Sequence, residues 1–146
     1  MDLLSNKVLV TAVICWFVAQ FIKVIIDYLL EGRLDLARIH GSGGMPSSHS
    51  ATICGISCAI GFAEGASSSL FALSVIMAII VMHDASNVRK SVGDHAKLLN
   101  QQFTELIQNG MNQKLFKELI GHKPVEVVAG AILGIVTSLL LYLFVW

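Results

Sequence analysis

Residues 41–50 read Gly-Ser-Gly-Gly-Met-Pro-Ser-Ser-His-Ser, a polar stretch that lies between two long apolar runs. Its glycines allow tight turns and let backbone N–H groups approach a ligand. Pro46 suits the first position of a helix, because its missing N–H costs nothing there. Ser47, Ser48 and His49 would then form the first helical turn, where exposed N–H groups and the helix dipole favour an anion. The stretch predicts a phosphate cradle with a proton donor at its edge; the alternative is a polar loop that only caps a membrane helix.

The composition is that of an integral membrane protein. The chain has 146 residues, of which 55% are hydrophobic and 14% charged, and its mean hydropathy is +0.73. A soluble domain carries about 25% charged residues. The length suits a single domain over residues 1–146. The formal net charge is zero and there is no nucleic-acid-binding signature, so we expect a membrane-embedded protein without a nucleic-acid partner.

The apolar segments predict an all-α fold, a polytopic transmembrane helix bundle of about four spans. The first and last segments, 8–30 and 125–146, are long enough to cross a hydrocarbon core of about 30 Å. The second and third, 46–63 and 70–82, are short. They would cross with the help of flanking residues or form a partly inserted hairpin. Residues 83–124 are polar, with apolar side chains at helical spacing, which is typical of an amphipathic helical segment.

The basic residues indicate a topology. They concentrate in the polar loops 31–47 and 83–124, whereas the opposite side has only Lys7. The positive-inside rule therefore places both loops in the cytoplasm, and we expect the membrane to be the plasma membrane. All candidate site residues then gather near one membrane surface. Gly130 and Gly134 have the spacing of close helix contacts, and together with the small number of spans they suggest a homodimer that completes the bundle.

A second motif, His122 with Glu126, suits nucleophilic chemistry on phosphorus. Glu126 lies one helical turn after His122, so its carboxylate can hold one ring nitrogen and leave the other free to attack. The attack also needs cations beside the phosphoryl oxygens and a proton donor for the leaving alkoxide. Lys23 and Arg89 can supply the charge, and His49 the proton. The alternatives are a capped helix start with an incidental imidazole, and a lysine that pairs along its own helix or extends to the membrane surface.

These motifs resemble those of the type 2 phosphatidic acid phosphatase and vanadium haloperoxidase superfamily. Pro46-Ser47-Ser48-His49 resembles its Pro-Ser-Gly-His motif, and His122 to Val127 resembles its His-x-x-x-Asp motif, with Glu126 in place of Asp. With Asp84 to Lys90 included, nearly the whole chain is similar to a small, divergent bacterial and plant branch. The resemblance implies that His122 is the nucleophile that forms a phosphohistidine, that His49 protonates the leaving group and that Glu126 orients His122. It also implies phosphate contacts from Lys23, from Ser48 and from the backbone beside it at Gly44 and Ser47, without a metal or other cofactor.

The chain departs from the superfamily pattern at its arginines. No Arg-Pro follows Lys23, and Phe116 stands about where the superfamily has Ser-Arg before the nucleophilic histidine. We assign the missing guanidinium to Arg89, with Arg38 as the weaker candidate. Because both arginine motifs are altered, a non-catalytic function must be considered beside the catalytic one.

The sequence therefore supports three hypotheses. The first is a membrane phosphatase that hydrolyses a lipid phosphate or diphosphate through a phosphohistidine. The second is a non-catalytic membrane protein that binds an anionic lipid or a partner through a decayed phosphatase-like site. The third is a metal site formed by His83, Asp84 and His95, although their spacing matches no common ligand pattern.

Overall fold

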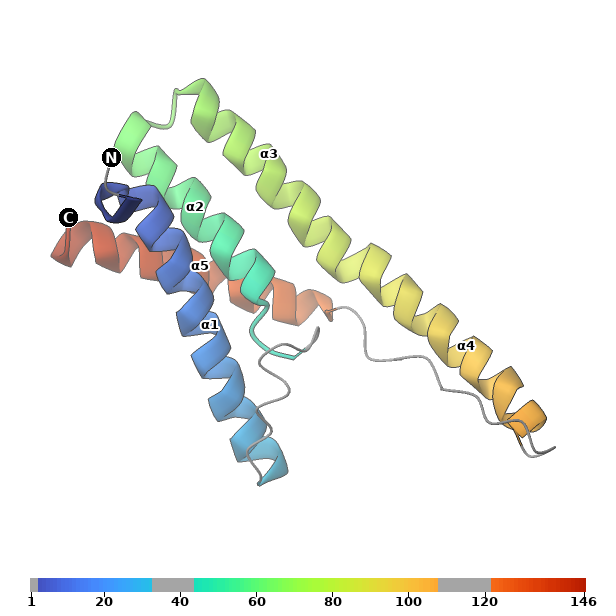
Figure 1. Cartoon of the computed structure of the whole chain (residues 1–146). Helices are drawn as coiled ribbons and strands as arrows, with labels where there is room; N and C mark the ends of the chain where they lie inside the picture. Colours follow the sequence, from blue (N-terminus) through green and yellow to red (C-terminus); the bar gives the residue numbers. More distant parts are fainter. Residues whose placement is uncertain (1–2, 33–43, 108–121) are drawn as a thin grey trace.

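The described part of the chain is entirely helical, as the sequence predicts. The computed structural model describes residues 3–32, 44–107 and 122–146 (Figure 1). In chain order the elements are η1 (Leu3–Ser5), α1 (Lys7–Glu31), α2 (Ser48–Glu64), α3 (Ser69–His83), the π-helical segment η3 (Asp84–Val88), α4 (Arg89–Ile107) and α5 (Pro124–Phe144).

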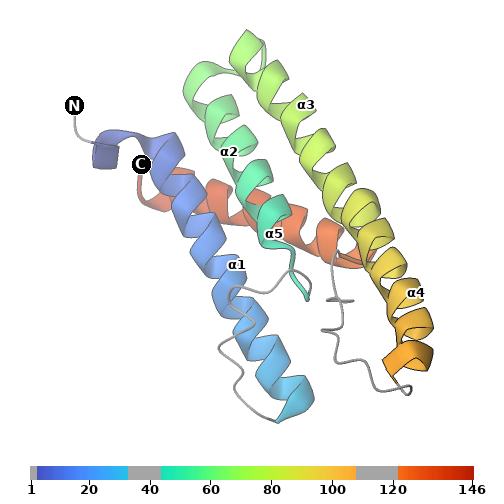
Figure 2. The ribbon, with the colours of Figure 1, turned by 45° about the vertical axis from the view of Figure 1, so that its right-hand side comes forward.

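Helix α2 is the centre of the bundle. It packs against α1, α3 and α5; α1 and α3 flank it, while α5 crosses behind it (Figures 1 and 2). The two chain ends lie at one end of the bundle, and α1 ends, α2 begins and α5 begins toward the other (Figure 1). This arrangement agrees with the predicted topology, in which both polar loops leave the bundle on the same side. Which side faces the cytoplasm stays a prediction.

Polar caps explain where the helices begin. The N-cap side chains of Asn6, Ser47 and Ser68 accept hydrogen bonds from the backbone N–H groups of residues three positions later, Leu9 (3.0 Å), Ser50 (3.4 Å) and Phe71 (3.1 Å). Pro124 occupies the first turn of α5, as expected. The prediction for Pro46 is wrong by two positions: the hydroxyl of Ser47 caps α2, so Pro46 precedes the cap and Ser48 is the first helical residue.

Three helical stretches within the described residues are long and apolar enough to cross a membrane: Lys7–Leu29, Ser69–Gln102 and Pro124–Phe144. The fourth apolar helix, α2, has 17 residues, which corresponds to about 25 Å and is shorter than a hydrocarbon core of about 30 Å. The neighbouring helices surround much of α2, so α2 need not span the hydrocarbon core by itself. The expected four apolar helices are present, but only three have the length of a full span.

The third apolar run and the amphipathic segment are not separate elements. Helix α3 continues through η3 into α4, so that one helical rod projects beyond the bundle (Figure 1). The third apolar run is therefore part of a helix longer than the short span expected, since Ser69–Gln102 has the length of a full span; α2 and α3 are joined by a short turn and pack against each other. The segment Asp84–Val88 contains neither glycine nor proline, so the backbone can stay helical there, with π-type pairing at the junction.

Glycines allow α5 to approach α2 very closely. A Cβ atom on Gly130 would overlap the backbone carbonyl of Ser47, and one on Gly134 would overlap that of Ala51. The glycine pair thus serves a contact within the chain. It no longer supports a homodimer, because its surface is already covered by α2.

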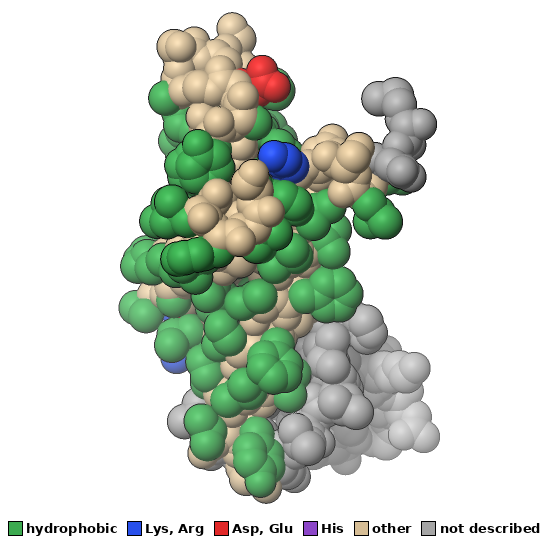
Figure 3. Space-filling model, turned by 90° about the vertical axis from the view of Figure 1, so that its left-hand side faces the viewer, with side chains coloured by type: hydrophobic (Ala, Val, Ile, Leu, Met, Phe, Trp, Pro, Cys, Tyr) green, Lys and Arg blue, Asp and Glu red, His purple; other side chains and the backbone are tan. Residues whose placement is uncertain are grey.

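The outer surface suits lipid. Large apolar side chains such as Phe17, Ile76 and Ile132 are 55–60% exposed, and hydrophobic side chains dominate the described surface in Figure 3. Exposed apolar area on this scale is expected of a helix bundle in a membrane.

Candidate functional site

His122 lies immediately before α5 and is held from two directions. Its backbone N–H donates to the carbonyl of Ala85 in η3, at 3.0 Å. Its ring Nδ1 lies 3.0 Å from Oε2 of Glu126, in the first turn of α5. The residue is 3% exposed. With Nδ1 facing a carboxylate, Nε2 is the ring nitrogen left for chemistry.

Glu126 is itself fixed by the helix start. Its Oε2 also accepts a hydrogen bond from the backbone N–H of Lys123 at 3.2 Å, which satisfies a donor at the N-terminus of α5. The same carboxylate therefore caps the helix and orients the His122 ring. The spacing His122–Glu126 predicted this contact.

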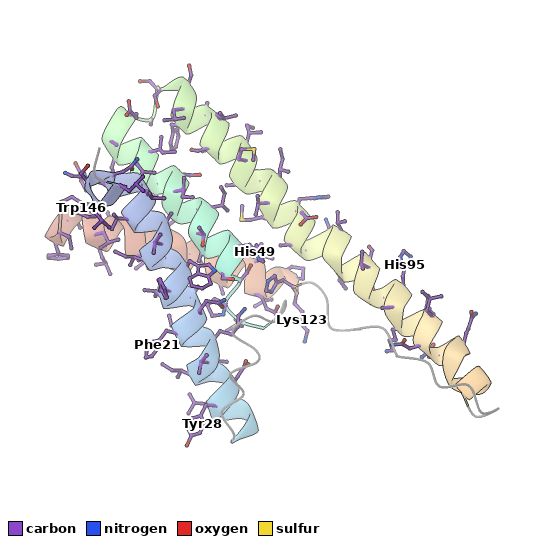
Figure 4. All side chains as sticks on the ribbon, in the orientation of Figure 1. Phe21, Tyr28, His49, His95, Lys123 and Trp146 are labelled. Carbon is purple, nitrogen blue, oxygen red and sulfur yellow. The ribbon has the colours of Figure 1, made fainter. Side chains whose placement is uncertain are left out.

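His49 comes from a distant part of the chain and meets His122. Its position in the first turn of α2 brings the two ring centroids to 6.1 Å, with an angle of 66° between the ring planes. Figure 4 shows His49 at the start of α2, near Lys123 at the start of α5. Two imidazoles at this separation can act on the two sides of one small anion.

Lys23 brings a positive charge from α1. It is 2% exposed, and its charge interacts with the carboxylates of Asp27 and Glu126. Its aliphatic stem runs past Gly44, where an added Cβ would lie 3.6 Å from Cδ of Lys23. Gly44 has φ +85°, a conformation that glycine adopts without strain. The predicted residues Lys23, Gly44, His49, His122 and Glu126 thus converge from three helices and one turn.

The two serines of the motif differ in what they do. Ser47 is fully buried; its hydroxyl caps α2 and bonds Ser50, and its N–H donates to the carbonyl of Glu126 at 3.0 Å. These contacts assign Ser47 to joining α2 and α5. Ser48, the first residue of α2, has its carbonyl bonded by the hydroxyl of Thr52 at 2.8 Å. Phosphate contact by either serine stays a prediction.

Some predicted features lie elsewhere. The side chain of Arg89 is outside the described residues, and so are Arg38 and Phe116. The proposed metal site of His83, Asp84 and His95 is wrong: within the described ranges no group of three or more His, Cys, Asp or Glu side chains could hold a metal ion. His83 and His95 are separated by about 18 Å along one helical rod.

Sequence reasoning missed two contacts that build the site. One is the bond from the N–H of His122 to the carbonyl of Ala85, and the other is the seating of Gly130 against Ser47. The contact of His122 with Ala85 depends on a π-type turn, which has no sequence signature from which it could have been predicted. The spacing of Gly130 and Gly134 did signal a close helix contact, but not its partner.

Comparison with known proteins finds a matching family profile and a similar curated protein. The profile of the Divergent PAP2 family matches residues 4–137. The chain is also similar to the uncharacterized membrane protein YuiD of Bacillus subtilis (strain 168), with 37% identity in an alignment 156 positions long that covers 99% of each chain. No solved structure matches.

Proposed function

Since the chain belongs to the Divergent PAP2 family, we propose that it is a membrane phosphatase that hydrolyses a lipid phosphate or diphosphate through a phosphohistidine. The observation that carries the proposal is the meeting of His49 and His122 at 6.1 Å, with Glu126 on Nδ1 of His122. A nucleophile, the carboxylate that orients it and a second imidazole are the groups that phosphoryl transfer to histidine requires.

In the first step, Nε2 of His122 forms a bond to phosphorus while the bond to the ester oxygen breaks. His49 donates a proton to the departing oxygen, and the lipid leaves as an alcohol or, from a diphosphate, as the lipid monophosphate. Glu126 accepts the hydrogen bond of Nδ1–H and stabilises the positive charge that develops on the ring. Lys23, which is buried on α1 with its stem beside Gly44, supplies a positive charge that offsets charge on the phosphoryl oxygens.

In the second step, water attacks phosphorus and His49, now neutral, accepts its proton. The phosphorus–nitrogen bond breaks, inorganic phosphate leaves, and His122 returns to its starting form. Both histidines therefore end the cycle as they began. A lipid substrate suits this site because the helices around it are apolar over most of their outer surface.

A second candidate function is binding without turnover. Among the described side chains that form the site, Lys23 is the cation, and its charge already interacts with Asp27 and Glu126. A phosphate would compete with these carboxylates. One lysine facing two carboxylates is also the arrangement expected of an anion-binding protein with a decayed catalytic site.

The two functions are separated by phosphate release from purified protein. Phosphatidate, polyprenyl phosphate and polyprenyl diphosphate are the substrates, and His122→Ala is the test variant. We expect the variant to release no phosphate above background, and the wild type to form an acid-labile phosphoprotein in rapid quench. The matched control is His95→Ala on α4, an exposed histidine outside the site. Substrate binding by the wild type without turnover would support the second function, and full activity of His122→Ala would refute the first.

A further inference from the structure

If a lipid binds with its phosphate at this site, its hydrocarbon chain must run along the helices. The site lies where α2 and α5 begin, and the apolar lengths of α1, α2 and α5 extend from there toward the chain termini (Figure 1). The chain of a bound lipid must follow the same direction to stay in an apolar environment. Two hollows lie along that direction, and their relation to His49 distinguishes them.

The first hollow is cut off from the site. It is a cavity of about 140 Å³ between α1, α2 and α5, lined by residues that include Thr11, Phe62 and Ser138. Between it and the histidines, Cys15 is fully buried and its thiol donates to the carbonyl of Gly134 at 3.7 Å. Gly55 closes the same junction, since a Cβ there would overlap Sγ of Cys15. The hydrocarbon chain of a lipid whose phosphate lies at His49 therefore cannot pass through this contact into the cavity.

The second hollow continues the face of α2 that bears His49. It is a groove of about 370 Å³ whose lining includes Ile56 and Ile60 on α2, Leu9 and Ala12 on α1, and Leu70 on α3. Ile56 and Ile60 follow His49 by seven and eleven positions, so both lie within about 20° of its direction around the helix. They lie about 10 Å and about 16 Å farther along the axis. The groove thus lies on the same face of α2 as His49, beginning about 10 Å farther along the helix, in the direction in which a lipid with its phosphate at His49 would extend its hydrocarbon chain.

We infer that this groove, formed by Leu9, Ala12, Ile56, Ile60 and Leu70, holds one hydrocarbon chain of the substrate and sets the preference for chain length. The inference rests on the proposed phosphatase function. The occupant follows from the shared face of α2, on which the groove lies in line with His49, and from the lining, which is aliphatic except at Asn6 and Glu64. A single helix forms the floor and one helix stands on each side, so the groove accepts one chain. A chain shorter than about 10 Å ends before Ile56 and gains nothing from the groove.

The test compares two single-chain substrates, hexyl phosphate and hexadecyl phosphate, in detergent. Ile56→Trp fills the floor of the groove, and Leu9→Trp fills its wall from a side chain that is 42% exposed and therefore free of core strain. We expect each variant to lower kcat/KM for hexadecyl phosphate at least tenfold and to change kcat/KM for hexyl phosphate less than twofold.

The matched control is Leu140→Trp on the lipid-facing side of α5. Ser47 lies against Gly130 and Ala51 against Gly134, so Leu140 is near the level of Ser57; it is 49% exposed and lies outside the groove. We expect this variant to treat both substrates as the wild type does. Equal losses on the two substrates in the groove variants, or no loss on either, overturn the groove while leaving the phosphatase in place. An inactive wild type overturns both.

Discussion

The closest backbone contact in the site makes Gly130→Ala the most informative single substitution. In the structure Gly130 lies against the backbone of Ser47, two residues before His49, and it follows Glu126 by one helical turn. An added Cβ would be 3.1 Å from both N and C of Ser47 and would overlap its carbonyl oxygen. These are backbone atoms, so the new methyl group cannot be relieved by rotation of a side chain.

The size of the effect follows from these distances. Carbon atoms in contact need about 3.5–4.0 Å, so α2 and α5 must separate by about 1 Å at this point. The same shift stretches the bond from the N–H of Ser47 to the carbonyl of Glu126, which is 3.0 Å. Displacing reacting groups by about 1 Å costs on the order of a hundredfold in rate, while overpacking costs about 1–3 kcal/mol of stability.

Phosphate release and thermal unfolding in detergent measure the two quantities. We expect Gly130→Ala to retain its helical circular dichroism, lose several degrees in Tm and lose about a hundredfold in kcat. The control is Gly61→Ala, where the added Cβ would meet the Phe71 ring at 3.0 and 3.2 Å. That ring belongs to a side chain away from the site and can turn aside, so we expect kcat to change less than threefold, roughly the effect of a minor core adjustment. Wild-type kcat in Gly130→Ala, or the same loss in both variants, would refute the reasoning.

Three further substitutions address the chemistry directly. Glu126→Gln replaces the carboxylate on His122 by an amide that can favour the wrong ring tautomer, so we expect formation of the phosphoprotein in rapid quench to be slower by up to about 10⁴-fold; an unchanged rate would remove Glu126 from its orienting role. His49→Ala deprives the alkoxide of its proton, so turnover of a lipid phosphate should fall about 10²–10⁴-fold, whereas the first step with p-nitrophenyl phosphate, whose leaving group needs no proton, should change much less. If both substrates lose equally, His49 is not the acid. Lys23→Met keeps the length of the side chain and removes its charge, so kcat/KM should fall about 10²-fold or more and recover in part in Lys23→Arg; equal activity of the methionine and arginine variants would contradict a role for the charge.

Much of the candidate site was predictable because its signals are local. The spacing of His122 and Glu126 within one helical turn determines that their side chains can meet, and they do so at 3.0 Å. A serine-rich turn before an apolar run predicts a helix N-terminus, and His49 is indeed in the first turn of α2. That both histidines belong to the same site followed from the resemblance of their motifs to one superfamily, since nothing local relates residues so far apart.

Local reasoning was less successful where two neighbours compete for one structural role. Pro46 and Ser47 both suit a helix start, and their order relative to the cap depends on which group satisfies the N–H of Ser50. The hydroxyl of Ser47 does so at 3.4 Å, which moves the first helical residue to Ser48. The same limit applies to residues 83–88, where the third apolar run ends at Met82 but the backbone remains helical.

By itself, the sequence determined the membrane environment and the apolar helices, and it predicted the residues proposed to carry phosphoryl chemistry, because hydropathy, helix propensity and side-chain spacing act within a few turns of one segment. Only the tertiary structure decided that α2 is the central helix, that Gly130 and Gly134 face Ser47 and Ala51 of the same chain, and that the carbonyl of Ala85 holds the N–H of His122. Those contacts depend on which faces of distant helices pack together. That choice is made by steric fit and hydrogen-bond satisfaction across the whole bundle, which no single segment encodes.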